Sequence, residues 1–227
     1  MTKRIGSGVS GLDEILHGGF LSGRAYLVSG APGTGKTIFG LHFLTPEQTE
    51  GAGLFVSFTE TEDHLRHDAG TLGIDMSGTA FLDLTAEADV FSEIQSYDIF
   101  SPVEVEREPV AKAMRAKIEQ IRPSRIFVDG FPDLRMISAD MFHFLRMVQS
   151  FFRFAASRGS TVLVSAAEGL TGMDVALQST ADGVIRLAGR RPARSLEVLK
   201  MRGGDFRAGR HPMRITSSGI EILSEAA

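Results

Sequence analysis

A chain of 227 residues with 43% hydrophobic and 23% charged residues has the composition of a globular protein, and we expect one domain over residues 1–227. It has no cysteine, which excludes disulfide bonds and thiolate metal sites, and its net charge of −4 argues against nucleic-acid binding through bulk charge. No apolar run approaches about 18 residues and the first residues lack the apolar segment of a signal peptide, so we expect no membrane span and a cytoplasmic protein.

The first part of the chain alternates apolar runs with segments of helical character, which favours a parallel sheet covered by helices. Turn and cap residues separate these segments. In chain order we expect a short helix that Ser10 caps and 18–19 end, a strand over 25–28, a helix that opens at Lys36 or Thr37, a strand over 53–58, a helix capped by Thr61, and a strand over 79–84.

The later part of the chain changes its pattern after residue 183, where short apolar runs follow one another without long helices. This favours an antiparallel extension of the sheet. We expect an acidic irregular segment over 85–107 with a short helix near 90–94, a helix from Pro109 that Pro123 stops, a strand over 125–129, a helix over 139–158 packed against the sheet by its apolar face, a strand over 161–165, and late strands over 184–187, 195–201, 211–215 and 219–223.

The stretch Gly30–Thr37 matches the phosphate-loop pattern G-x-x-x-x-G-K-[ST] at every fixed position. Its glycines permit backbone angles closed to other residues, so loop N–H groups can point at phosphate oxygens, and the helix that follows adds partial positive charge. Lys36 adds a full positive charge, and Thr37 adds a hydroxyl suited to Mg²⁺. The alternative, a glycine-rich turn with a lysine by chance, does not explain the strand before and the helix after. The predicted nucleotide-binding residues are Gly30, Gly33, Thr34, Gly35, Lys36 and Thr37.

Asp129 is the candidate for the second metal ligand. It ends the strand predicted over 125–129, which we expect to lie adjacent to the strand of the phosphate loop. Strands of open α/β sheets end at the ligand-binding edge, where a carboxylate can hold hydrated Mg²⁺. The alternative is an aspartate that caps a turn with Gly130.

Glu60 is the candidate for orienting or deprotonating the attacking water. It follows the strand predicted over 53–58, which we expect to lie near the phosphate-loop strand. A glutamate is ionised at neutral pH and can accept a proton. Glu62 and Asp63 compete for this role, although acidic residues in the first turn of a helix are common stabilisers.

Lys200 and Arg202 stand at the end of a late predicted strand and share one face if the strand continues. Positive charge against the transferring phosphoryl group would supply part of the catalytic rate, whereas the alternative is a solvated edge strand. Residues 186–214 contain nine basic and two acidic side chains, a local charge of +7, which leaves −11 on the rest of the chain. This polarity suits an interface between copies or an anion-binding face.

The motifs together resemble those of the KaiC-like ATPases, RecA-fold proteins related to the cyanobacterial clock protein. The resemblance covers nearly the whole chain and rests on Ser7–Leu16, Gly30–Thr37, Phe58–Thr61, Asp129 and Lys200–Gly203, in the order and spacing of that family.

This resemblance implies a RecA-type P-loop NTPase core and a homo-oligomeric ring, usually of six subunits, with ATP and Mg²⁺ bound between neighbours. It implies that Glu60 acts on water and that Lys200 and Arg202 reach the nucleotide of the adjacent subunit. The function it implies is a slow regulatory or signalling ATPase, with a regulatory protein as a possible partner.

The sequence departs from the family pattern at three places. Thr59 replaces the first of two adjacent glutamates, which leaves one carboxylate, and Phe206 stands where the clock protein has a histidine. Ser179-Thr180 falls in the region of clock-type autophosphorylation, but the surrounding sequence is not close, so we favour hydrolysis over autokinase activity. Two other functions stay open: a recombinase-like DNA-binding ATPase, disfavoured by the overall acidity, and a scaffold that binds ATP with little hydrolysis.

Overall fold

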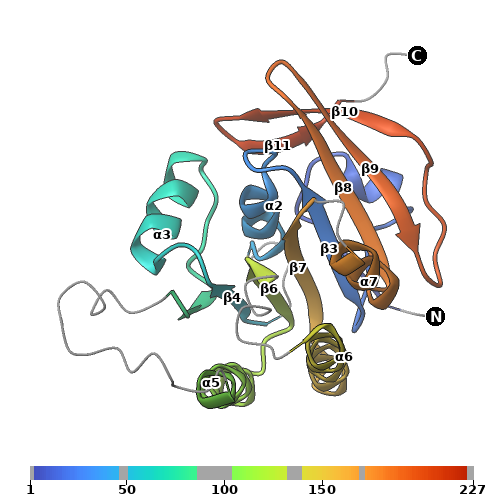
Figure 1. Ribbon diagram of the computed structural model, residues 1–227. Helices are drawn as coiled ribbons and strands as arrows, with labels where there is room; N and C mark the ends of the chain where they lie inside the picture. The colour runs from blue at the N-terminus through green and yellow to red at the C-terminus, as the bar shows by residue number, and fades with distance from the viewer. Residues whose placement is uncertain (1–2, 46–50, 86–103, 132–139, 169–171, 224–227) are drawn as a thin grey trace.

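Residues 3–45, 51–85, 104–131, 140–168 and 172–223 are described by the structure, which is a computed structural model. Most of the strands join one nine-stranded sheet, and two short strands pair separately near the N-terminus (Figure 1). The short pair is β1 (Arg4–Ile5) and β2 (Phe20–Leu21), and the large sheet holds β3 (Ala25–Gly30), β4 (Gly53–Ser57), β5 (Thr79–Asp83), β6 (Arg125–Asp129), β7 (Thr161–Ala167), β8 (Gly183–Arg190), β9 (Ala193–Met201), β10 (Arg210–Thr216) and β11 (Gly219–Ile222).

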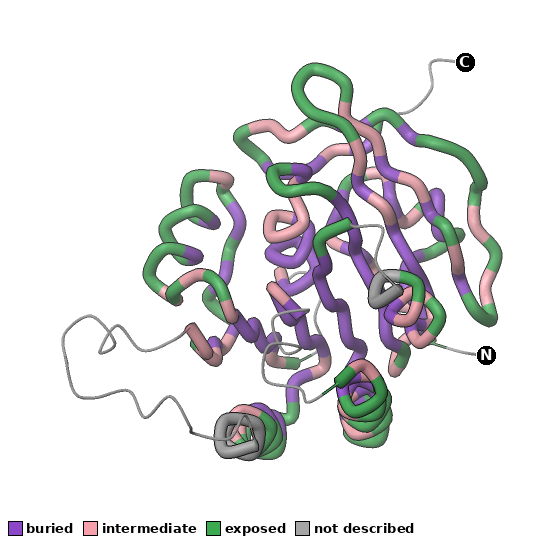
Figure 2. The backbone as a smooth tube through the Cα atoms, viewed as in Figure 1, coloured by how far each residue is buried: buried purple, intermediate pink, exposed green. Residues whose placement is uncertain are grey.

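The sheet has the strand order β11-β10-β9-β8-β3-β7-β6-β4-β5. Strands β3 to β8 pair in parallel, whereas β9, β10 and β11 extend the sheet by antiparallel pairing. All residues of β3, β4 and β6 are buried, as expected for parallel strands with both faces covered (Figure 2). The predicted fold class, a RecA-type α/β core with an antiparallel C-terminal extension, is confirmed.

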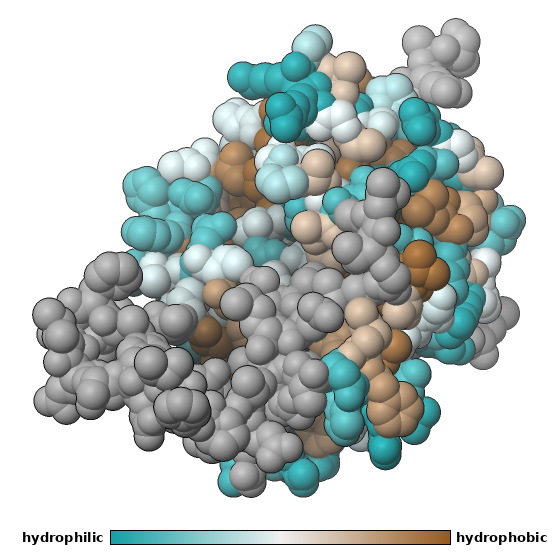
Figure 3. Space-filling model, viewed as in Figure 1, coloured by the Kyte–Doolittle hydropathy of each residue, from teal (hydrophilic) through white to brown (hydrophobic). Residues whose placement is uncertain are grey.

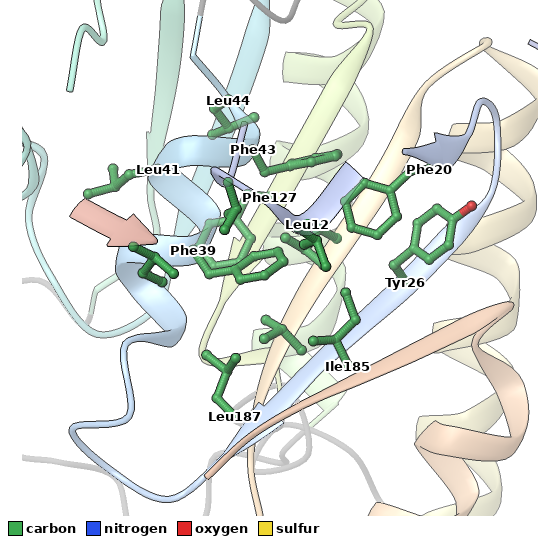
Figure 4. Packing of buried hydrophobic residues seen from close by; sticks show 14 of the residues in the cluster. Leu12, Phe20, Tyr26, Phe39, Leu41, Phe43, Leu44, Phe127, Ile185 and Leu187 are labelled. Atoms are coloured by element: carbon green, nitrogen blue, oxygen red, sulfur yellow. The ribbon is translucent and has the colours of Figure 1, made fainter. Parts of the chain in front are cut away.

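Helices cover both faces of the sheet and divide the core into two clusters of buried residues. Phe39, Phe127 and Leu187 belong to the first cluster, part of which is drawn in Figure 4. Val128, Phe144 and Val148 belong to the second. The first face carries α1 (Leu12–Ile15), α2 (Lys36–Phe43) and α3 (Glu62–Thr71), and the second carries α5 (Glu104–Ile121), α6 (Met141–Ser157) and α7 (Gly172–Thr180).

Local chemistry explains several boundaries. Helix α6 starts after Asp140, whose carboxylate accepts a hydrogen bond from the His143 N–H at 2.9 Å, and Thr61 precedes α3 as predicted, although its side chain makes no capping bond. Hydrophilic residues gather over α3 on the surface seen in Figure 3. None of the described helices combines the length and apolar character needed to cross a membrane.

Several details of the sequence prediction were wrong. Gly11, in the left-handed region at φ 82°, and not Ser10, precedes α1, and α5 begins at Glu104 rather than at Pro109. Strands β1 and β2 and helix α7 were not predicted, because segments of two to nine residues carry too little periodicity. The helix expected near 90–94 lies outside the described residues.

The expected neighbourhood of the phosphate-loop strand also needs correction. Strand β6, which carries Asp129, is not adjacent to β3, because β7 lies between them, and β4 lies beyond β6. The carboxyl ends of these parallel strands nevertheless meet at one edge of the sheet, which is where Asp129 and the phosphate loop come together.

Candidate nucleotide-binding site

The phosphate loop connects the carboxyl end of β3 to the first residue of α2. Gly33 and Gly35 have φ angles of 79° and 104°, in the region that glycine adopts without strain. A Cβ atom at Gly30 would lie 2.4 Å from the carbonyl oxygen of Leu187. No side chain caps the start of α2, so its first N–H groups are available to an anion.

Thr37 and Asp129 lie in direct contact, although they are 92 residues apart in the sequence. The Thr37 hydroxyl donates a hydrogen bond to Asp129 Oδ2 at 2.7 Å. The other carboxylate oxygen, Oδ1, accepts a short hydrogen bond from the hydroxyl of Ser165 on β7, and Ser165 Oγ accepts one from the N–H of Gly130 at 3.0 Å. The intervening strand thus holds the Asp129 carboxylate in one orientation beside Thr37.

The oxygen atoms of Thr37 and Asp129 are the type of ligand that Mg²⁺ prefers. Among the described residues, no group of three or more His, Cys, Asp or Glu side chains is arranged to hold a metal ion. A magnesium site here would therefore need phosphate oxygens and water besides the two protein ligands, which is how Mg²⁺ is commonly bound with nucleotides. The donor set fits the ion.

Lys36 lies over the loop, where Nζ donates hydrogen bonds to the carbonyl oxygens of Gly30 at 2.7 Å and Ala31 at 3.1 Å. Burial lowers the pKa of this ammonium, and the negative charge of Asp129 opposes the shift. A triphosphate in the loop would offer its oxygens to the same ammonium.

Glu60 follows β4, in which Ser57 pairs with Asp129 of β6. The backbone N–H of Glu60 donates to Ser57 Oγ at 3.0 Å, so the turn after β4 is held at the same edge of the sheet. Burial raises the pKa of Glu60, and the negative charges of Asp129 and Asp68 add to the shift. The carboxylate is therefore a stronger base than a fully solvated glutamate.

Sequence reasoning missed two residues of this site. Ser165 is polar and buried in a central apolar strand, and that pattern was the available signal. From the sequence alone, Arg194 counted only as one of the nine basic residues of 186–214. In the structure its Nη2 approaches the carbonyl oxygen of Gly33 at 3.4 Å. Its Nε is buried without a hydrogen-bond partner in the described part of the chain, and the residue lines a cavity of about 410 Å³ with Ile215 and Thr216.

Lys200 and Arg202 lie away from the phosphate loop of their own chain. Strand pairing places Met201 opposite Gly183, which pairs with Tyr26 at the beginning of β3, whereas the loop follows the end of β3. Four residues of strand separate these levels, about 13 Å at the usual rise. The structure thus brings Lys36, Thr37, Asp129 and the turn with Glu60 to the carboxyl ends of the parallel strands. Lys200 and Arg202 lie near the opposite ends of these strands.

The fold and the site define the chain as a P-loop nucleotide-binding protein of the α/β class. The family model described as the KaiC ATPase matches residues 5–227, and the chain belongs to this family. Membership assigns it, at the family level, to the ATP-binding P-loop ATPases.

The relatives include both short proteins and the longer clock protein. A UPF0273 protein of Pyrococcus horikoshii is 32% identical over 242 residues, which cover 99% of this chain and 96% of that protein. Another, of Thermotoga maritima, is 30% identical and covers 98% and 96%. The circadian clock oscillator protein KaiC of Synechococcus elongatus is 28% identical over 95% of this chain but only 43% of its own length.

Proposed function

We propose that the protein binds ATP with Mg²⁺ at the phosphate loop and hydrolyses it slowly, as one copy in a homo-oligomeric ring. The observation that carries the proposal is the 2.7 Å hydrogen bond between Thr37 and Asp129, which joins the two expected magnesium ligands. Slow turnover follows from Thr59, because one carboxylate remains where the family often has two. A ring of six, a cytoplasmic location and a signalling or regulatory role complete the proposal.

In the proposed reaction, a water oxygen attacks the γ-phosphorus and the bond to the β–γ bridging oxygen breaks, which yields ADP and phosphate. Glu60 accepts the proton of the attacking water. Lys36 and the loop N–H groups stabilise the charge on the phosphoryl oxygens. A magnesium ion held by Thr37 and Asp129 would neutralise phosphate charge.

The basic pair at the end of β9 is proposed to act on the nucleotide of a second copy. Both residues lie at the edge of the sheet opposite their own phosphate loop. The +7 charge of residues 186–214 and the −11 of the rest favour contact between unlike faces of neighbouring copies.

Replacing Glu60 by glutamine tests hydrolysis directly. Glu60→Gln should bind ATP nearly as tightly as the wild type, because the side chain is not part of the loop, and phosphate release should fall by at least about a hundredfold. Calorimetric titration with ATP and a phosphate-release assay measure the two quantities.

Glu62→Gln is the matched control, because Glu62 bonds Arg66 at 2.8 Å on α3 and should leave release nearly unchanged. Undiminished release in Glu60→Gln would refute the assignment. ATP binding without any release by the wild type would favour the scaffold function, which Thr59 motivates. Salt-dependent, ATP-stimulated binding of single-stranded DNA would favour a recombinase-like function.

A further inference from the structure

Ser165 lies on β7, between the strand of the phosphate loop and the strand that ends at Asp129. The backbone pairing of β6 with β7 ends with Val128 opposite Val164. Asp129 and Ser165 are the next residues of the two strands, so they stand at the same level. Successive side chains of a strand point to opposite faces, and Val128 and Val164 belong to the second core cluster. Asp129 and Ser165 therefore point to the first face, where α2 carries Thr37.

The hydroxyl group of Ser165 is engaged both as a donor and as an acceptor. It donates its one proton to Asp129 Oδ1 and accepts a hydrogen bond from the N–H of Gly130 at 3.0 Å. Gly130 has a φ angle of 77°, in the region that favours glycine, directly after Asp129. Ser165 is 1% exposed and Asp129 6%, so little water competes for these bonds. The hydroxyl group is thus fixed between two neighbouring groups of β6.

The two carboxylate oxygens of Asp129 have different partners. Oδ1 is bound by Ser165, whereas Oδ2 accepts the hydrogen bond of Thr37 at 2.7 Å. A carboxylate can turn about its last single bond, because that torsion is broad. The bond to Ser165 opposes this rotation, since turning the carboxylate would break it. Oδ2 is therefore the oxygen of Asp129 that is held on the side of Thr37.

The number of oxygens that Asp129 can offer bears on the choice of metal ion. Mg²⁺ demands nearly octahedral geometry and keeps several of its water molecules. Ca²⁺ accepts more oxygen ligands in a flexible geometry, including both oxygens of one carboxylate. A carboxylate that offers one oxygen meets the needs of Mg²⁺ and denies Ca²⁺ a bidentate ligand.

We propose that Ser165 is a positioning residue that makes the site selective for Mg²⁺ over Ca²⁺, because it holds Asp129 so that only Oδ2 is offered to the ion. The inference rests on the proposed function, since it concerns a metal ion bound with ATP at the phosphate loop. Ser165 itself contacts neither the ion nor the nucleotide. Its loss lets the carboxylate turn and offer both oxygens, which favours Ca²⁺ relative to Mg²⁺.

Calorimetric titration of the full chain with ATP tests the selectivity, in the presence of Mg²⁺, of Ca²⁺, or of EDTA without either metal. The wild type should bind ATP more tightly with Mg²⁺ than with Ca²⁺. Ser165→Ala should lower this preference by at least about tenfold, as is typical when a residue that orients a metal ligand is lost. The affinity for ATP in EDTA should stay nearly unchanged. A general loss of order would weaken binding with both metals and leave their ratio as it is.

Ser160→Ala is the matched control. Ser160 is as buried as Ser165, lies just before the other end of β7, and donates one hydrogen bond to the carbonyl oxygen of Pro123 at 2.6 Å. This variant should keep the wild-type preference for Mg²⁺. Ser165→Cys retains only a weak donor and should lower the preference in the same direction, so it replaces the alanine variant if that variant does not fold.

Hydrogen exchange of the full chain, followed by NMR without metal or nucleotide, tests the hold on β6 separately. The Gly130 amide should exchange at least about tenfold faster in Ser165→Ala, because it loses the oxygen that accepts its hydrogen bond. Ser160→Ala should leave this rate nearly unchanged. Unaltered exchange of Gly130 in Ser165→Ala would overturn the role of the hydroxyl group.

The measurements separate this proposal from the proposed function. An unchanged preference for Mg²⁺ in Ser165→Ala, or a wild type that binds ATP equally well with both metals, would overturn the selectivity while ATP binding stands. A wild type that binds no ATP, with either metal or in EDTA, would overturn the proposed function and the selectivity together.

Discussion

His42 is a buried imidazole in α2, the helix that follows the phosphate loop. Its Nε2 accepts a hydrogen bond from the N–H of Ile220 at 3.0 Å, which fastens β11 to this helix. A Cβ atom at Gly219 would lie 1.9 Å from the same nitrogen, so the imidazole ring can occupy this position only beside a glycine. Burial lowers the pKa of His42 to about 4.

At the residue scale, we expect the free energy of unfolding to fall in mild acid because of His42. The folded state holds the imidazole neutral down to about pH 4, whereas the unfolded chain takes up the proton near pH 6.5, so protons favour unfolding between these values. The free energy of unfolding that is lost through protonation of His42 should reach about 3 kcal/mol. Urea unfolding at a series of pH values measures it as the difference between the wild type and His42→Gln.

That difference should shrink as the pH falls from 7 to 4, although His42→Gln is itself less stable at pH 7. His64→Gln is the control, because His64 is exposed on α3 and should leave the pH dependence unchanged. A constant difference between wild type and His42→Gln across this range would contradict the assignment.

At the scale of elements, close packing of α2 on β6 brings Thr37 to Asp129. Gly40 permits this approach, since a Cβ atom there would lie 2.0 Å from the ring of Phe127, a strand β6 residue that Figure 4 shows beside the helix. The glycine is needed for space and not for its backbone angle, because it lies inside a regular helix.

Gly40→Ala should therefore destabilise the protein by about 1–3 kcal/mol and weaken ATP binding, because α2 must move away from β6. Gly70→Ala is the matched control on α3, where nothing lies within 4 Å of the added methyl group. The Gly70→Ala substitution should stabilise the protein by up to about 1 kcal/mol and leave the affinity for ATP unchanged. Thermal unfolding and nucleotide titration test both; equal behaviour of the two variants would refute the packing argument.

Elements with strong local signals were predicted well, and those whose form depends on partners were not. The strand of the loop, the strand that ends at Asp129 and the apolar face of α6 all follow from contiguous pattern. The placement of β7 between β3 and β6, by contrast, depends on which strands pair across the fold. No local residue pattern encodes that order.

At the scale of the whole molecule, the residues expected to take part in hydrolysis lie at opposite ends of the strands of one sheet. Lys36 and Asp129 are at the carboxyl edge, and Arg202 is near the other. A single copy with this geometry cannot place its own Arg202 on its own nucleotide without unpairing β9 from β8. Completion of the site by a second copy is the proposal that resolves this separation.

Mixing two inactive variants tests completion by a second copy. Arg202→Ala keeps an intact loop and Lys36→Ala keeps an intact Arg202, so neither should hydrolyse ATP well alone. In a random equal mixture, about one quarter of the interfaces would combine both intact parts. Phosphate release should therefore rise well above that of either variant.

Solution mass with ATP must show that the variants co-assemble, and a mixture of Arg202→Ala with the wild type gives the upper reference. High salt should weaken assembly if residues 186–214, with their charge of +7, contact the acidic remainder of a neighbouring copy, which carries −11. Release equal to the average of the two variants, in assemblies shown to be mixed, would argue against a shared site.

The sequence by itself determined the phosphate loop, the candidate carboxylates and the α/β class, because each depends on backbone angles or periodicity within a few consecutive residues. Only the tertiary structure decided that Thr37 contacts Asp129, that Ser165 holds the same carboxylate, and that Lys200 donates a hydrogen bond to the carbonyl oxygen of Ala181, just after α7. These contacts join residues 92, 36 and 19 positions apart. They depend on strand order and on helix packing, which arise only when the whole core is buried.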